Sequence, residues 1–160
     1  MDVPDDEIQD PMHARSGGVD PGRDGCRVPL PWSGTKSPFG FSSKHSTGEP
    51  WLPQPPVFAN YTVEAEERDP QSMLSLYKQA LGIRKSDEAL GDGPFEWIDL
   101  GSGALAFRRG DGFICVTNFA DQALELPKGE VILASTELGD VENGVGKLPT
   151  DSTAWLRPQH

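Results

Sequence analysis

Short apolar runs separated by turn-forming residues dominate the second half of the chain. Phe95–Leu100 and Ala104–Arg109 flank Gly101-Ser102-Gly103, a spacing that is typical of a β-hairpin. The run Phe113–Phe119 is almost continuously apolar, which predicts a strand buried on both faces. Three more strands are expected, at Gln122–Leu126, Val131–Ser135 and Thr153–Arg157. Short strands at this regular spacing predict an antiparallel sheet or a small sandwich, with the glycine-rich stretch Gly139–Gly146 as a separating loop.

One amphipathic helix is predicted before these strands, over about Pro70–Arg84. Asp69 is a good N-cap, and Pro70 would occupy the first helical position, where its missing N–H costs nothing. Apolar residues recur at helical spacing on one stripe: Met73, Leu76, Tyr77, Ala80 and Leu81. Such a stripe needs another surface to pack against.

The first sixty residues are typical of a long irregular loop. They hold ten of the fifteen prolines, and Val28–Trp32 and Trp51–Pro56 are too proline-rich for a helix or a central strand. Large aromatic side chains are unfavourable to leave in water, so they are expected to anchor this loop to a surface. The expected anchors are Trp32, Phe39, Phe41, Trp51 and Phe58.

Charge and composition exclude several classes of partner. The formal net charge is -11, and an acidic surface repels both phosphate backbones and anionic membranes. No apolar run approaches the ~20 residues that span a bilayer, and the first residues do not resemble a secretory signal. We therefore expect no nucleic acid and no membrane as partner.

Cysteine and histidine usage suggests neither a disulfide framework nor a metal site. The only cysteines, Cys26 and Cys115, lie far apart, which favours a reduced cytoplasmic protein. Zinc is not expected, because these cysteines and the histidines His13, His45 and His160 show no ligand spacing. The expectation is therefore no metal.

Three blocks of sequence together resemble α-glucosidases and oligo-1,6-glucosidases of the α-amylase superfamily. The first runs from Gly22 to Trp32 (GRDGCRVPLPW) and continues with Pro38–Phe41 (PFGF) and Pro50–Pro55 (PWLPQP). It is similar to a loop of the family's catalytic barrel, in a version typical of actinobacterial enzymes. The second block, Asp69–Arg84, resembles the last barrel helix. The third resembles the small β-domain that follows the barrel, and comprises Phe113–Phe119 and Leu148–Arg157.

The resemblance implies a mainly β fold with two parts. Residues 1–90 would be the loop-rich C-terminal tail of a (β/α)8 barrel with its last helix, and residues 91–160 an antiparallel, sandwich-like β-domain. The complete enzyme would cleave terminal α-glucosidic bonds of oligosaccharides, with retention and without an organic cofactor. The family's catalytic Asp, Glu and Asp would all precede Met1. Because glycoside hydrolysis needs two positioned carboxylates, this chain is expected to contain no catalytic residue, to be inactive alone and to need the missing N-terminal barrel as partner.

Arg23, Asp24 and Arg27 are the candidate substrate-binding residues of the complete enzyme. The resemblance implies that Arg23 reaches the pocket of the terminal glucose, and a guanidinium suits this role because it binds a carboxylate or neighbouring hydroxyls through two parallel hydrogen bonds. For Asp24 and Arg27, an ion pair inside the loop is the favoured alternative. Cys26 is interpreted as a small buried residue rather than a nucleophile.

Other functions remain open at this point. The β-domain with its aromatic-rich loop could be a non-catalytic glucan-binding module. The chain could also belong to a trehalose- or sucrose-processing relative that transfers glucose, since such relatives share the loop and the β-domain. A degraded gene product without a stable fold is the third alternative.

Overall fold

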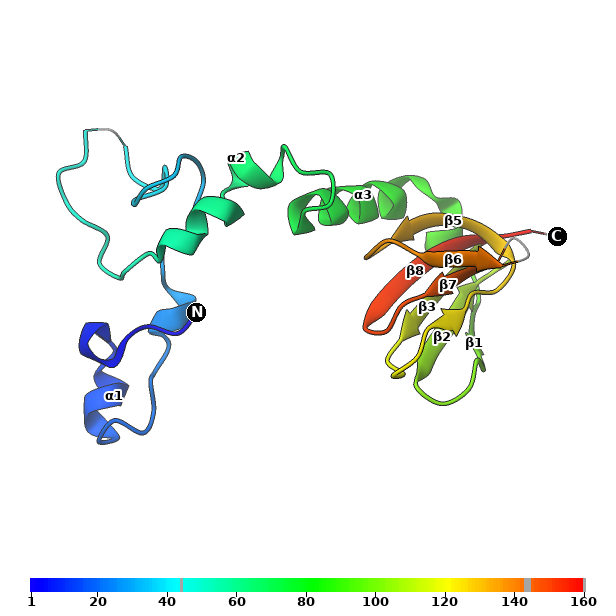
Figure 1. Ribbon diagram of the computed structural model, residues 1–160, viewed down its shortest axis with the longest axis horizontal. Helices are drawn as coiled ribbons and strands as arrows, with labels where there is room; N and C mark the ends of the chain where they lie inside the picture. Colours follow the sequence, from blue (N-terminus) through cyan, green and yellow to red (C-terminus); the bar gives the residue numbers. More distant parts are fainter. Residues whose placement is uncertain (44, 143–144, 160) are drawn as a thin grey trace. The chain divides into compact units, whose positions relative to one another are not determined.

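The computed structural model describes residues 1–43, 45–142 and 145–159, with side chains outside 140–145. Residue contacts divide the chain into two compact units. We call residues 1–75 the loop unit and residues 76–160 the β unit. Figure 1 shows the short helices of the first and the sheets of the second.

The loop unit contains only short helical pieces joined by irregular chain. These are η1 (Asp5–Glu7), α1 (Pro11–Arg15), η2 (Asp24–Cys26), η3 (Pro56–Tyr61) and α2 (Val63–Glu66). Between η2 and η3 the chain forms neither helix nor strand in its described residues, as proline content predicts. The turn before Phe39 includes a cis peptide bond at Ser37-Pro38.

Only part of the predicted aromatic anchoring is present. Phe39 is almost fully buried and lies 6.2 Å from Phe58, ring centre to ring centre. Trp32, Phe41 and Trp51 are half exposed or more, so the prediction was wrong for these three. Leu52, rather than its neighbour Trp51, is buried.

Helix α3 spans Met73–Ser86, three residues later than predicted at its start and two at its end. Asp69 is not its N-cap: the Asp69 carboxylate accepts a hydrogen bond from the Gln71 N–H in a local turn. Ser72 takes the capping role, because its hydroxyl oxygen accepts from the Ser75 N–H at 3.1 Å. The Ser72 hydroxyl also donates to the Glu66 carbonyl, which fixes where the helix begins.

The predicted apolar stripe of α3 is divided between two faces. Leu76, Ala80 and Ile83 are half-buried, whereas Tyr77 and Leu81 are exposed. The helix therefore has one covered and one open apolar face, which a single stripe did not predict.

The β unit contains two antiparallel sheets (Figure 1). The larger has the order β1 (Phe95–Ile98), β2 (Ala104–Arg109), β3 (Phe113–Asn118), β8 (Ser152–Pro158) and β5 (Gly129–Ala134). The smaller has the order β4 (Leu124–Glu125), β7 (Val145–Leu148) and β6 (Gly139–Glu142). The mainly β, antiparallel fold class is confirmed. The stretch Gly139–Gly146 is not a plain loop, since both β6 and β7 draw on it.

Apolar side chains from both sheets form one core. Val116 and Ala154 on the larger sheet and Leu148 on the smaller are fully buried, and Leu126 completes the cluster. The prediction that Phe113–Phe119 is buried on both faces is confirmed for its first four residues. Ile114 and Val116 face the core, while Phe113 and Cys115 face the other side of the sheet. That second side receives the turn η4 (Glu88–Leu90), since Arg157, which shares this side of the sheet with Trp155, forms an ion pair with Asp87 at the start of the turn.

Candidate functional site

A buried carboxylate organises the loop unit around η2. Asp24 is 1% exposed, and its Oδ2 accepts hydrogen bonds from the backbone N–H groups of Gln9 at 2.6 Å and Asp10 at 2.7 Å. These contacts span 14 and 15 residues of sequence. One side chain therefore ties the segment before α1 to the GRDGCR loop.

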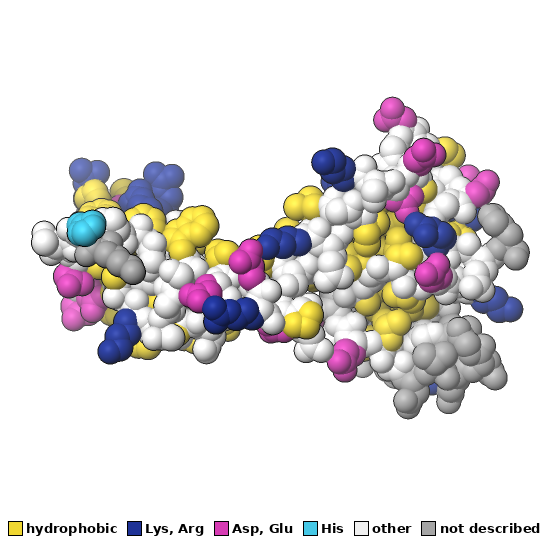
Figure 2. All heavy atoms as spheres, turned by 90° about the horizontal axis from the view of Figure 1, so that it is seen from above, with side chains coloured by type: hydrophobic (Ala, Val, Ile, Leu, Met, Phe, Trp, Pro, Cys, Tyr) yellow, Lys and Arg dark blue, Asp and Glu magenta, His cyan; other side chains and the backbone are white. Residues whose placement is uncertain are grey.

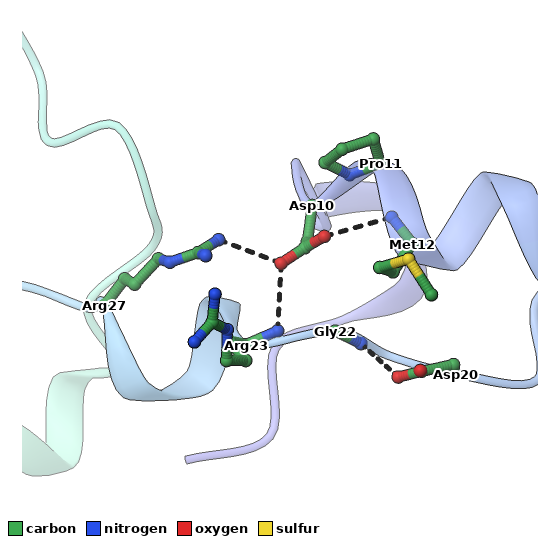
Figure 3. A pocket seen from close by; sticks show the side chains of 7 residues that line it. All are labelled: Asp10, Pro11, Met12, Asp20, Gly22, Arg23 and Arg27. Carbon is green, nitrogen blue, oxygen red and sulfur yellow. Dashed lines mark hydrogen bonds and ion pairs between the residues drawn. The ribbon is translucent and has the colours of Figure 1, made fainter.

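Asp10 is the second carboxylate of this network, and it was not among the site residues predicted from the sequence. Its Oδ1 accepts from the Met12 N–H at 3.0 Å and caps α1, while its Oδ2 accepts from the Arg23 N–H at 3.1 Å. Figure 3 shows both contacts. An Asp followed by Pro at the first helical position is a cap signal that the sequence offered at Asp10-Pro11. Its contact with Arg23 had no sequence signal, because the two residues meet only in the folded loop.

Arg27 completes the network by joining the two carboxylates. Its guanidinium lies 2.9 Å from Asp10 Oδ2 and 3.2 Å from Asp24 Oδ1. The ion pair predicted between Asp24 and Arg27 is therefore present, and Arg27 makes a second one with Asp10. Both carboxylates point at the same guanidinium, so the charge of Arg27 is compensated within the loop.

Gly22 permits the close approach of these segments. Its φ is +69°, and a β-carbon there would lie 2.5 Å from the Asp10 carboxyl carbon. A side chain would be unfavourable on both counts. This glycine brings the Arg23 N–H within reach of Asp10.

Arg23 differs from Asp24 and Arg27 because its side chain has no bonding partner among the described residues. Its backbone N–H donates to Asp10 and its carbonyl oxygen accepts from the Cys26 N–H, but its guanidinium makes no hydrogen bond or ion pair with the described residues. It lines a shallow pocket of about 380 Å³ together with Asp10, Pro11, Met12, Asp20, Gly22 and Arg27. The pocket thus presents one uncompensated guanidinium, which can bind a carboxylate or a pair of hydroxyls.

No pair of carboxylates in this pocket is arranged for glycoside hydrolysis. Asp10 is fully engaged by Met12, Arg23 and Arg27, and Asp20 accepts from the Gly22 N–H at 2.8 Å. Among the described residues, no group of three or more His, Cys, Asp or Glu side chains could hold a metal ion.

We expect the carboxyl of Asp10 to titrate below its usual value near 3.8. The Met12 and Arg23 N–H groups lower its pKa most, and the charge of Arg27 lowers it further, although burial acts in the opposite direction. Since the pKa of Asp10 is lower in the folded state, its carboxylate stabilises the fold at pH values above the unfolded pKa. This stabilisation is lost as the pH falls through the folded pKa. Carboxyl-detected NMR titration should show this, and Asp10→Asn should remove that part of the acid sensitivity. A pKa of Asp10 at or above 3.8 would contradict the network.

The two cysteines lie in different environments. Neither forms a disulfide: Cys26 is exposed and Cys115 is buried. The prediction that Cys26 is buried was wrong, because η2 turns its side chain outward while Asp24 occupies the interior. Burial raises the pKa of the Cys115 thiol. In the part of the chain that the structure describes, no helix is long and apolar enough to cross a membrane.

Glucosidases are among the known proteins to which this chain is similar. The family model of the α-amylase catalytic domain matches residues 2–93. A probable α-glucosidase of Rhizobium meliloti is 35% identical over 127 residues, which cover 76% of this chain and 22% of that protein. A glucan 1,6-α-glucosidase of Streptococcus pneumoniae is 32% identical over 127 residues, covering 78% of this chain and 22% of that protein.

Among solved structures, the α-glucosyl transfer enzyme XgtA is 28% identical, with a TM-score of 0.73. The match covers 99% of this chain and 30% of that one. The chain thus spans about a fifth of the length of the curated relatives that it matches. With more than half of its residues matched by the catalytic-domain model, this chain belongs to the α-amylase family.

Proposed function

We propose that this chain serves as the C-terminal part of an α-glucosidase that cleaves terminal α-glucosidic bonds of oligosaccharides with retention. Residues 1–90 would be the end of the catalytic barrel domain and residues 91–160 its β-domain. The catalytic-domain match, which ends at residue 93, supports this division. The descriptions of the Rhizobium and Streptococcus relatives support the reaction and the class of substrate.

The free guanidinium of Arg23 is the observation that supports this proposal, and it identifies Arg23 as the candidate substrate-binding residue. Its backbone is fixed by Asp10, while its side chain reaches into the pocket without a partner among the described residues. In the complete enzyme Arg23 would bind a pocket carboxylate beside the terminal glucose, or two hydroxyls of that sugar. Asp24 and Arg27 would serve binding indirectly, by holding the loop that presents Arg23.

The remaining machinery would come from the part of the enzyme that this chain lacks. That part would supply the two carboxylates that hydrolysis needs, so the 160-residue chain alone would be inactive. Neither a metal nor an organic cofactor would be needed. The two free cysteines support a reducing compartment, and we place the enzyme in the cytoplasm.

Glucosyl transfer is the second candidate function. It is favoured by the 28% identical structure, which is an α-glucosyl transfer enzyme. The two reactions share the covalent intermediate and differ in whether water or a sugar hydroxyl accepts the glucosyl group. Products longer than the substrate would identify transfer, whereas free glucose alone would identify hydrolysis. A glucan-binding module is the third candidate, and retention on amylose without cleavage would identify it.

A chimaeric enzyme tests the proposed function. This chain replaces the matching segment of the Rhizobium relative, and glucose release is measured from maltose and isomaltose. We expect an active chimaera in which Arg23→Lys lowers kcat/KM by about ten- to a hundredfold, because a charged two-pronged hydrogen bond contributes about 1.5–3 kcal/mol. Arg15→Lys on α1 is the matched control, since Arg15 is exposed. A folded chimaera without cleavage, or equal kinetics of the two variants, would contradict the proposal.

A further inference from the structure

Asp20 is a second charged residue of the pocket that Arg23 lines. Both residues are exposed, and both border the cavity of about 380 Å³. Figure 3 shows them at the two ends of the short segment that contains Gly22. They form no ion pair with each other, and among the described residues neither has an ion-pair partner elsewhere. The pocket therefore presents a cation and an anion that do not neutralise each other directly.

The position of Asp20 is fixed by hydrogen bonds on two sides. Its Oδ1 accepts from the Gly22 N–H at 2.8 Å. Its own N–H donates to the hydroxyl of Ser16, the residue that ends α1, at 2.8 Å. Pro21, which follows, has a restricted φ. Only Oδ2 of Asp20 has no partner among the described residues, and an acceptor held in this way loses little conformational freedom when it binds a ligand.

A sugar hydroxyl satisfies both charged groups of the pocket. It accepts a hydrogen bond from the guanidinium of Arg23 and donates one to the carboxylate of Asp20. An anionic ligand would bind Arg23 alone, because a guanidinium holds carboxylates and phosphates through paired charge-assisted bonds. The same ligand would be repelled by the charge of Asp20. The two residues together therefore favour an uncharged ligand with several hydroxyls.

The other residues of the pocket do not take over this selection. Arg27 is paired with Asp10, so Asp20 is the one carboxylate that lines the pocket without a counter-ion among the described residues. Pro11 and Met12 form an apolar wall that suits the C–H groups of a sugar ring. Figure 2 shows acidic and basic side chains interspersed on the face of the loop unit turned to the viewer. Since exposed charges beyond about 8 Å are screened at physiological salt, the groups at the pocket itself decide which ligand it accepts.

We propose that Asp20 is a specificity-determining residue of this pocket. Its Oδ2 accepts a hydrogen bond from a hydroxyl of an uncharged glucoside, and its charge keeps ligands that carry a carboxylate or a phosphate away from Arg23. The proposal rests on the proposed function and narrows the class of substrate to uncharged glucosides. It assigns Asp20 a direct contact with the substrate, in contrast to Asp10 and Asp24, which hold the loop.

Phosphate binding by the 160-residue chain tests the repulsive half of the proposal without any need for activity. The probe is inorganic phosphate, titrated at neutral pH and constant ionic strength, and the readout is the ¹³C NMR signal of the Arg23 guanidinium. We expect Asp20→Asn to bind phosphate at Arg23 about five times more tightly than the unsubstituted chain, because a neighbouring like charge is removed. Asp99→Asn is the matched control and should leave this affinity unchanged. Asp99 is also exposed and its Oδ1 accepts from the Gly101 N–H at 2.9 Å, but it lies in the β unit. Equal phosphate affinities of the two variants would overturn the proposal.

Inhibition of the chimaera with the Rhizobium catalytic domain tests the attractive half. Hydrolysis of p-nitrophenyl α-glucoside is inhibited with glucose and with glucuronate, which carries a carboxylate in place of the hydroxymethyl group. We expect Asp20→Asn to lower the preference for glucose over glucuronate about tenfold, through a weaker hydroxyl contact and the loss of repulsion. Asp99→Asn should keep the preference of the unsubstituted chimaera. An active chimaera with the same preference in both variants would overturn this inference and leave the proposed function standing. A folded chimaera without cleavage would contradict the proposed function, whereas the phosphate titration still decides whether Asp20 repels anions from Arg23.

Discussion

Asn118→Asp is expected to destabilise the β unit by about 4 kcal/mol at neutral pH, although it changes the side chain by a single atom. Asn118 is completely buried. Its Nδ2 donates to the carbonyl oxygens of Gln122 at 2.8 Å, Leu148 at 3.0 Å and Pro149 at 3.1 Å. The substitution replaces this donor with a charged oxygen that faces three carbonyl oxygens.

The pH dependence separates charge from shape in this variant. Burial and the three carbonyl oxygens would raise the pKa of the introduced carboxyl in the folded state above its unfolded value of about 3.9. A carboxyl whose pKa is raised in the folded state makes its full contribution to stability below the unfolded pKa. This contribution is lost as the pH rises through the folded pKa. The stability difference between variant and unsubstituted chain should therefore be smallest near pH 4 and largest at pH 7.

Urea denaturation at the two pH values, followed by tryptophan fluorescence, measures this difference. Asn60→Asp adds the same charge at an exposed position and should change stability by less than about 0.5 kcal/mol. Asn118→Ala, which removes the hydrogen bonds without adding a charge, should fall between the two, at about 2–3 kcal/mol. If Asn118→Asp and Asn118→Ala lose the same stability at pH 7, the three carbonyl contacts do not govern this site.

Local sequence signals located most of the larger sheet. Strand β2 has the residues predicted for it. The bounds of β3 and β8 differ from the predicted bounds by at most one residue at each end. These strands are apolar runs between glycine turns, so the information lies within a few neighbouring residues. The capping of α3 by Ser72 instead of Asp69 shows the limit of such signals, because two residues can cap and the tertiary hydrogen bond to Glu66 decides between them.

Strands β6 and β7 could not be found in this way. Their sequence is glycine-rich and charged, which disfavours a strand in isolation, and they pair with each other and with β4 rather than with a strongly apolar neighbour. Gly146 lies in β7, where a β-carbon would be 3.2 Å from the Leu138 side chain. The glycine that suggested a loop is therefore explained by close packing.

The candidate site was predicted only where its contacts are local. The ion pair between Asp24 and Arg27 joins residues three apart, and it was the favoured alternative for these two residues in the sequence. Asp10 lies 13 residues from Arg23 and 17 residues from Arg27, both of which it holds. No periodicity links such positions, so this half of the network emerges only from the fold.

Asp24→Ala is expected to open the loop unit around η2. Two backbone N–H groups, those of Gln9 and Asp10, would lose their acceptor. Arg27 would keep only Asp10. The Asp10 N–H is buried and the Gln9 N–H is part-buried, and an unpaired buried donor costs about 1–3 kcal/mol. The free energy of local opening should therefore fall by about 3 kcal/mol. Amide hydrogen exchange at Gln9 and Asp10 measures this opening directly.

Two further variants separate the roles of the Asp24 oxygens. Asp24→Asn can keep an acceptor at the position of Oδ2, where both N–H groups donate, but it removes the charge that faces Arg27. It should therefore retain most of the exchange protection. Asp20→Ala is the matched control, because the exposed Asp20 holds only the Gly22 N–H. If Asp24→Asn opens the loop as far as Asp24→Ala, the charge opposite Arg27 holds the loop. If Asp24→Ala exchanges no faster than Asp20→Ala, Asp24 does not organise the segment that presents Arg23.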